Sequence, residues 1–194
     1  RRTQIGRDPE LNALLELELV EAKENEGKLE ETSKRLRELL ATSPQQRRSV
    51  DHFERFARKH DRPEDLAQAF RTRAAMARSE ANAEEDSELN YFSTREEAQQ
   101  HVAAEEQRAA WIYLNQLEQP EKALQAFDAS LEATPTDPYV LWGRACALGQ
   151  CGRDAEAAET LASTITQLDG GEKGALLWQQ AMAFERAGEP QQAL

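Results

Sequence analysis

The sequence predicts an all-α protein made of repeated helix pairs, and three observations support this fold class. Nine glycines and seven prolines separate stretches rich in Ala, Glu, Leu, Gln and Arg, which lose little free energy on becoming helical. No run alternates β-branched with polar residues, so no strand is predicted. The sequence also repeats with a period of 34 residues, and a fixed period of this length indicates stacked units.

The period is visible in apolar residues that recur at equal intervals. Pairs separated by 34 residues are Leu114 and Leu148, Ala123 and Ala157, Phe127 and Leu161, and, near the N-terminus, Leu36 and Phe70. Amphipathic helices alone fix a period of about 3.6 residues and nothing longer. The spacing therefore favours a repeat over the alternative, which is a plain helical bundle or another helical solenoid.

Five units fit the period, and each is expected to hold two amphipathic helices joined by a short turn. The units span about residues 13–46, 47–80, 104–137, 138–171 and 174–194, and the last of them is cut short. Leu15, Leu19 and Ala22 recur at intervals of four and three residues, so they are expected to form the buried stripe of the first helix.

Glycine and proline mark the turns and the helix ends in each unit. Glycine tolerates the left-handed conformation that closes a first helix, and proline can start a second helix because its missing N–H is not needed there. Turns are expected at Gly27, Asp61, Gly152 and Gly188, second helices begin near Pro63, Pro120 and Pro190, and Pro44 and Pro135 end two of them.

Residues 81–103 interrupt the repeat as an acidic insertion followed by a helix extension. Ser93 and Thr94 each stand three residues before a glutamate, which gives two overlapping capping boxes. A helix is therefore predicted from Arg95 to about Leu117, longer than the other first helices.

The part of the insertion before this helix, residues 81–93, has four acidic residues and no basic one. It is expected to form a loop, and two interpretations stay open. The loop is either a solvated connector or a docking segment, because the aromatic pair Tyr91 and Phe92 after several acids is typical of a peptide that binds a basic groove.

The charge of the chain excludes several functional classes. The 24 Lys and Arg and 36 Asp and Glu residues give a net charge of −12, which disfavours binding to nucleic acid or to an anionic membrane. Residues 47–79 are the exception, with nine basic and five acidic side chains and a local charge of +4. The acids interleaved there still disfavour a phosphate-binding strip.

The sequence also argues against a membrane span, a disulfide framework and a catalytic or metal site. No apolar run approaches the ~18 residues that a membrane span needs. Cys146 and Cys151 fit neither a disulfide framework nor a zinc site, which favours a reducing, cytoplasmic location. The histidines His52, His60 and His101 lack metalloprotease spacing. With no phosphate loop and no nucleophile elbow either, we expect no enzyme activity, metal or cofactor.

These units resemble the tetratricopeptide repeat family. The resemblance is clearest in the third and fourth units, which have small residues at Ala123 and Ala157 and large ones at Phe127 and Leu161, with Pro135 closing the third. It implies a right-handed superhelix of helix pairs, in which the first helices line a concave groove.

Two units depart from the family pattern beside the insertion. The family has a small residue midway along the first helix, where Glu54 and Trp111 stand in the second and third units. Distorted stacking is expected there. The lysine and asparagine with which chaperone-binding members hold a carboxylate are replaced by Asp51 and Arg55, so that activity is not carried over.

The resemblance also implies which side chains line the groove. They are Leu14, Leu17 and Glu21 in the first unit; Arg48, Asp51, Arg55 and Arg58 in the second; Arg108, Ile112 and Asn115 in the third; Tyr139, Trp142 and Cys146 in the fourth; and Trp178 and Met182 in the fifth. This groove is basic near the middle and aromatic towards the C-terminal end. The alternative for Trp142 and Trp178 is that they pack between neighbouring units.

The function that follows is a non-enzymatic scaffold or adaptor that binds a peptide or helix of a partner protein in the groove. No nucleic-acid partner and no membrane insertion are expected, and self-association through residues 81–103 is a further expectation. The alternative is a regulatory or substrate-recruiting region of a larger multidomain enzyme or machine, in which the acidic insertion is autoinhibitory or drives oligomerisation.

Overall fold

The structure is a computed structural model that describes residues 9–42, 46–83, 91–167 and 172–192. Within these ranges every regular element is helical, so the predicted all-α fold is confirmed. The helices are α1 Pro9–Asn25, α2 Leu29–Thr42, α3 Arg47–Lys59, α4 Pro63–Ala81, α5 Arg95–Asn115, α6 Pro120–Ala133, α7 Pro138–Gln150, α8 Asp154–Gln167 and α9 Glu172–Arg186, followed by the short 3-10 helix η1 Pro190–Gln192.

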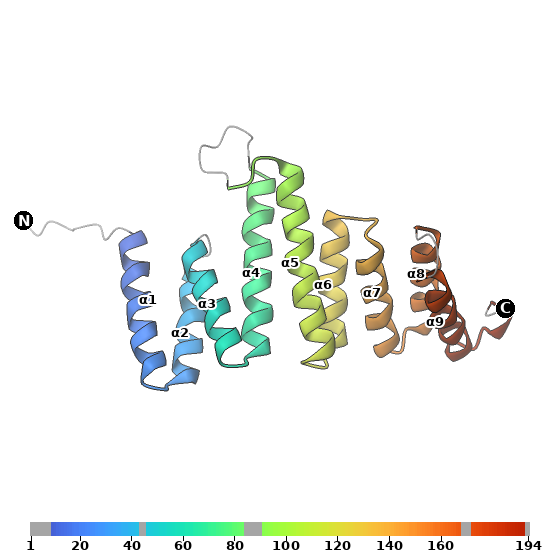
Figure 1. Ribbon diagram of the computed structural model, residues 1–194, viewed down its shortest axis with the longest axis horizontal. Coiled ribbons are helices and arrows are strands. Elements are labelled where there is room, and N and C mark those ends of the chain that lie inside the picture. The colour runs from blue at the N-terminus through green and yellow to red at the C-terminus, as the bar shows by residue number, and fades with distance from the viewer. Residues whose placement is uncertain (1–8, 43–45, 84–90, 168–171, 193–194) are drawn as a thin grey trace, which may run out of the picture.

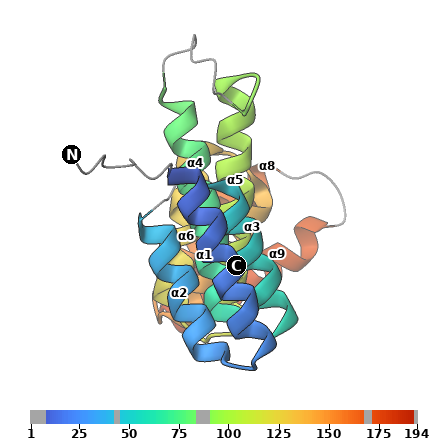
Figure 2. The same cartoon turned by 90° about the vertical axis from the view of Figure 1, so that its left-hand side faces the viewer.

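The helices form antiparallel pairs that stand side by side in an elongated stack. Figure 1 shows α1 at one end of the stack and α9 near the other. Viewed along the stack, α2, α4 and α6 lie on one side and α3, α5 and α9 on the other (Figure 2). We call the side formed by the first helix of each pair, which are α1, α3, α5, α7 and α9, the first-helix face.

The turn between the two helices of each pair contains one residue in the left-handed conformation. Three of these residues are glycines, with φ of 75° at Gly27, 73° at Gly152 and 79° at Gly188. Asp61 has a φ of 48° at the position that the sequence analysis marked as a turn. Glu118 has a φ of 53° and was not predicted. A residue with a side chain is strained in this conformation, so Glu118 stores some free energy in its turn.

Helix α5 begins where the capping residues predicted. The Thr94 hydroxyl accepts a hydrogen bond from the Glu97 backbone N–H at 3.0 Å, and the Glu97 carboxylate accepts one from the Ser93 N–H at 3.0 Å. Of the two overlapping capping boxes, the one between Thr94 and Glu97 is therefore formed. Helices α4 and α5 extend past their neighbours at one side of the stack (Figure 1). The acidic residues at 84–88 lie outside the described residues.

Buried small residues fix how the two helices of a pair approach each other. Ala123 in α6 is 0% exposed and Ala157 in α8 is 2% exposed, as the 34-residue phase requires. Phe127, which follows Ala123 by one helical turn, is also fully buried. These residues belong to one apolar core that runs from α4 to α9.

The large residue Trp111 is accommodated by the next first helix. Its ring lies 5.2 Å from the Phe127 ring, nearly perpendicular to it. Facing these rings on α7 is Gly143, where a Cβ atom would lie 2.4 Å from Phe127 Cζ and 3.0 Å from Trp111 Cζ2. The missing side chain at Gly143 therefore supplies the space that Trp111 and Phe127 occupy.

The apolar stripe expected on α1 is not buried, which corrects the sequence analysis. Leu15 and Leu19 are 51% and 50% exposed. One repeat later, Ser49 and Phe53 occupy the same positions on α3 and are both 0% exposed. These positions pack against the preceding helix pair, and among the described residues no helix precedes α1. The stripe on α1 therefore occupies the positions that contact a preceding helix pair in the next unit, and on α1 these positions are exposed.

Candidate functional site

A hollow lies between α1 and α3 on the first-helix face. It contains six of the side chains that the sequence analysis placed in the groove. Its lining is Leu14, Leu17, Glu18 and Glu21 from α1, and Arg48, Asp51, His52 and Arg55 from α3. Six of the seven side chains predicted for the first two units are therefore brought together, and Arg58 lies outside this lining. Glu18 and His52 are the residues that the prediction missed.

The α3 wall of the hollow presents two guanidinium groups without a carboxylate partner. Arg48 and Arg55 are exposed, and no described Asp or Glu oxygen lies within 4.0 Å of either side chain. This is uncommon in the described part of the chain, where most Lys and Arg side chains make an ion pair. The basic residues without one are Arg48, Arg55, Arg95, Lys122 and Lys173.

A buried histidine positions one of these guanidinium groups. His52 is 6% exposed, and its Nδ1 lies 3.2 Å from Arg55 Nη2 and 3.6 Å from Glu21 Oε1. Burial, reinforced by the Arg55 charge, lowers the pKa of His52 below its usual value. Since a guanidinium can only donate, the neutral imidazole accepts at Nδ1 and carries its proton on Nε2, which has no hydrogen-bond partner.

Next to the hollow, Arg73 on α4 is the centre of an ion-pair network that joins α3, α4 and α5. Arg73 Nη2 lies 2.9 Å from Asp51 and 2.7 Å from Glu54, and its Nη1 lies 3.6 Å from Glu105 on α5. Glu54 also accepts from Arg58 at 2.8 Å. Glu54 is therefore tolerated at a position that favours small residues because two guanidinium groups neutralise it. Burial raises the pKa of Glu105, whose side chain is almost fully enclosed.

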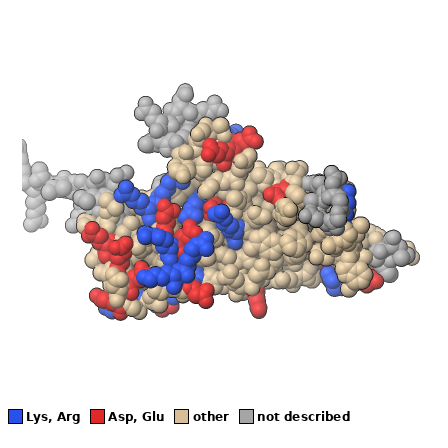
Figure 3. Space-filling model, in the orientation of Figure 1, with Lys and Arg blue, Asp and Glu red and all other residues tan. Residues whose placement is uncertain are grey.

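Two further groove residues meet between α3 and α5. The guanidinium carbons of Arg58 and Arg108 lie 5.5 Å and 5.8 Å from the centre of the buried Phe70 ring. Arg108 also pairs with Glu105 at 2.8 Å. Figure 3 shows Lys and Arg side chains gathered over this N-terminal half, whereas the C-terminal half of the same face is mostly uncharged.

The aromatic residues of the C-terminal half divide into one packed and two open side chains. Trp142 lies 5.4 Å from the Trp111 ring, and its Nε1 donates to Gln179 at 3.0 Å. Trp142 therefore packs from α7 against α5 and α9, as the alternative interpretation expected. Tyr139 and Trp178 are open, with 61% and 69% of their surface exposed.

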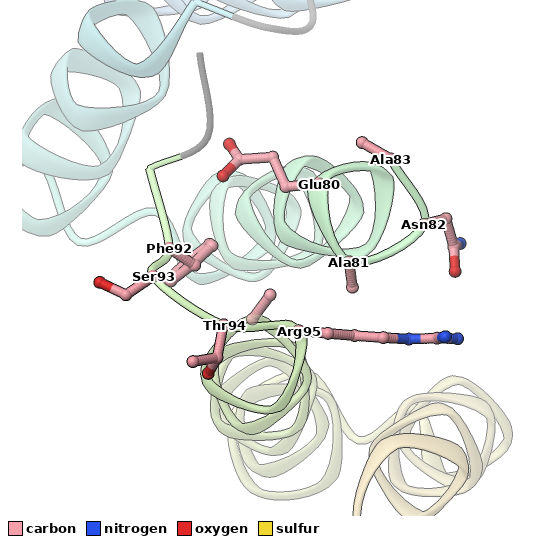
Figure 4. A pocket seen from close by; sticks show the side chains of 9 residues that line it. Glu80, Ala81, Asn82, Ala83, Phe92, Ser93, Thr94 and Arg95 are labelled. Carbon is pink, nitrogen blue, oxygen red and sulfur yellow. The ribbon is translucent and has the colours of Figure 1, made fainter. Parts of the chain in front are cut away.

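A second cleft lies between the end of α4 and the start of α5 (Figure 4), and all but one of its lining residues belong to the 81–103 insertion. It is lined by Glu80, Ala81, Asn82, Ala83, Phe92, Ser93, Thr94, Arg95 and Ala98. Next to it, the Arg47 guanidinium stacks 3.8 Å from the centre of the Tyr91 ring and pairs with Glu80, which also accepts from the Tyr91 N–H at 3.0 Å. The aromatic end of the insertion thus contacts the start of α3.

Metal and membrane sites are not found in the part of the chain that the structure describes. It contains no group of three His, Cys, Asp or Glu side chains that could hold a metal ion. It also contains no helix whose length and apolarity would allow it to cross a bilayer.

Comparison with known proteins gives a match in structure only. No protein-family model matches the chain, and no curated protein matches it. The crystal structure of MamA protein superposes with a TM-score of 0.52 at 10% identity, over 93% of this chain and 85% of that one. The fold is a helical repeat of the tetratricopeptide type. PilF of Pseudomonas aeruginosa also matches, at 15% identity over 95% of this chain and 88% of that one, with a TM-score of 0.40.

Within this tetratricopeptide-type fold, the groove positions differ in how far they reach solvent. Ile112 is 6% exposed in the core cluster, so it offers almost no surface to a ligand, contrary to its expected place in the groove lining. Cys146 and Met182 are half-buried, whereas Asn115 is exposed. Burial raises the pKa of the Cys146 thiol, which keeps it protonated near neutral pH and makes it a poor nucleophile.

Proposed function

We propose that this chain is a protein-interaction scaffold that holds a segment of a partner protein along the first-helix face. One observation carries the proposal: six residues that the family resemblance places in the groove line a single hollow between α1 and α3. A helical repeat presents a continuous surface along its stack, and its first helices contribute neighbouring strips of it.

The residue types along this face support the same function. Arg, Tyr and Trp are the usual anchors of protein interfaces, because they bury a large area for a small loss of conformational freedom. Arg55 and Arg58 are exposed in the N-terminal half, and Tyr139 and Trp178 are exposed in the C-terminal half. Of the two tryptophans predicted to line the groove, Trp178 is the one open to a partner, because Trp142 is already engaged with Trp111 and Gln179.

Peptide selection followed by mapping tests this function. A random-peptide display library is selected on the immobilised chain, and an enriched peptide is titrated while backbone amide NMR shifts are recorded. Shifts are expected on the first helices, which are α1, α3, α5, α7 and α9. Arg48→Ala should weaken binding, whereas Lys34→Ala on α2, a matched loss of one exposed charge, should not. Enrichment no greater than on an unrelated helical protein, or shifts confined to α2, α4 and α6, would contradict the proposal.

A further inference from the structure

The hollow between α1 and α3 has two walls of opposite charge. Leu14, 41% exposed, and the half-buried Leu17 provide apolar surface on α1. Beside them on α1 stand Glu18 and Glu21, both exposed. Across the hollow, α3 presents exposed guanidinium groups. A ligand in this hollow would therefore meet apolar and acidic side chains on α1, and on α3 two guanidinium groups beside the paired carboxylate of Asp51.

The guanidinium groups of Arg48 and Arg55 make no ion pair with a described residue, and the two acids of their own helix are paired with other side chains. Asp51, which lies between Arg48 and Arg55 on the same helix, accepts from Arg73 on α4 at 2.9 Å. Glu54 is bound by Arg58 and by the same Arg73. Arg73 thus shares the charge of Asp51, which still lines the hollow, and Arg58 and Arg73 together neutralise that of Glu54.

One of these free groups is also held in place. Arg55 Nη2 donates to the buried His52 Nδ1, which limits the rotamers of an otherwise exposed side chain. A guanidinium fixed before binding loses less conformational freedom when a carboxylate arrives. The α3 wall therefore has the properties of a preorganised carboxylate site.

The acidic wall is also available to a ligand. Glu18 makes no ion pair with any described residue. Glu21 approaches the ring of His52 at 3.6 Å, and that imidazole is neutral near pH 7 because burial lowers its pKa. The charges on both walls thus lack a full counter-charge within the described chain.

We infer that this hollow takes a partner segment in which an apolar side chain is flanked by a carboxylate on one side and by a Lys or Arg on the other. The carboxylate meets Arg48 and Arg55, the apolar side chain covers Leu14 and Leu17, and the cation meets Glu18. This inference rests on the proposed function and names the chemistry of its partner. Opposite charges on the two walls also give the bound segment one preferred orientation.

Synthetic peptide sets with one fixed apolar centre test the inference. One set carries an acidic flank and a basic flank, and the others carry two acidic flanks, two basic flanks or two neutral flanks. Binding of the full chain is measured by fluorescence anisotropy. The set with opposite charges is expected to bind best, by about tenfold over the set with two basic flanks, since it alone satisfies both walls.

Two charge-reversed variants identify the walls. The double variant Arg48→Glu, Arg55→Glu should shift the preference to two basic flanks, and Glu18→Lys, Glu21→Lys should shift it to two acidic flanks. The matched control is Arg95→Glu, Lys122→Glu, which makes the same change in net charge with two other cations that lack ion pairs. Arg48→Gln, Arg55→Gln provides a neutral version in which no new repulsion is introduced. Circular dichroism checks that each variant stays folded.

The outcomes separate this inference from the proposed function. Shifts of preference in the two wall variants but not in the control support the inference. Binding whose flank preference is the same in all variants, or changes equally in the control, overturns the inference and leaves the scaffold function standing. If no peptide set binds and library selection also yields nothing, both fail.

Discussion

Gly143 lies in the middle of α7, where two aromatic rings press against the helix. A Cβ atom at this position would lie 2.4 Å from Phe127 Cζ and 2.5 Å from Phe127 Cε1. Real atoms do not approach so closely, so Gly143→Ala must displace a ring. Phe127 is fully buried and its ring is held edge-to-face against Trp111, so it has little room to move.

The expected change in stability is the difference between two opposing effects. Replacing glycine by alanine inside a helix stabilises it by about 0.5–1 kcal/mol, because the unfolded chain becomes less flexible. Overpacking a tight core costs about 1–3 kcal/mol. Since the clash involves a rigid ring, we expect the cost to win and Gly143→Ala to lose about 1–2 kcal/mol. For a chain of this length that corresponds to a fall in Tm of about 2–8 °C.

Gly149, near the end of the same helix, is the matched control. A Cβ there would meet no atom closer than Arg186 Nη2, at 3.8 Å, which is an ordinary contact. Gly149→Ala should therefore leave stability unchanged or raise it by up to about 1 kcal/mol. Both variants are compared by urea denaturation followed by circular dichroism. If Gly143→Ala proves as stable as Gly149→Ala, the contact between α6 and α7 is not as tight as described. Adding Phe127→Leu should recover part of the loss, which a double-mutant cycle would measure.

Four further predictions concern other parts of the stack. Phe53→Ala should cost about 3–5 kcal/mol in denaturation experiments, whereas Leu19→Ala, one repeat earlier and half exposed, should cost less than about 1 kcal/mol; equal losses would mean that α1 is covered. Ala157→Leu should cost about 1–3 kcal/mol by forcing α7 and α8 apart, and a neutral result would show that the repeat phase is wrong. Glu118→Gly should stabilise by about 0.5–1 kcal/mol by relieving the left-handed turn, measurable as a higher urea midpoint. The pKa of His52 is lowered in the folded chain, so as the pH falls His52 binds a proton in the unfolded chain before it does so in the folded chain. Unfolding free energy should therefore fall as pH drops below about 6.5, and this part of the slope should vanish in His52→Gln.

The features that the sequence predicted well are those that depend on local spacing. Helix starts at Thr94 and Pro120 follow from cap and proline chemistry, which acts within one helical turn. Spacing also tells which residues share one side of a helix, since that is a periodic property. That the first helices face a common groove was implied by the family resemblance, and in the structure Arg48, Arg55 and Leu17 line the same hollow.

Other features depend on contacts between helices and have no local signal. The second unit has nine basic residues, and nothing in the spacing tells which of them reaches Glu54 from α4. The repeat phase places Ile112 at the position that corresponds to Arg55, on the groove side of its helix. Whether Ile112 is exposed there depends on how large the neighbouring side chains are. The open stripe at Leu15 was missed for the same reason, because its burial depends on what stands next to it in space. Glu118 is different: it stands 34 residues before Gly152, so the repeat phase marks it as a turn position, but glutamate is not a residue typical of a left-handed turn.

The uneven distribution of charge over the first-helix face affects how fast another molecule can reach it. The chain carries a net charge of −12, yet its cations gather over α3 and α5 on that face (Figure 3). Such a molecule has an electric dipole that turns its positive side towards an approaching acidic surface and repels that surface elsewhere. Added salt should then slow association steeply and change the rate of dissociation much less.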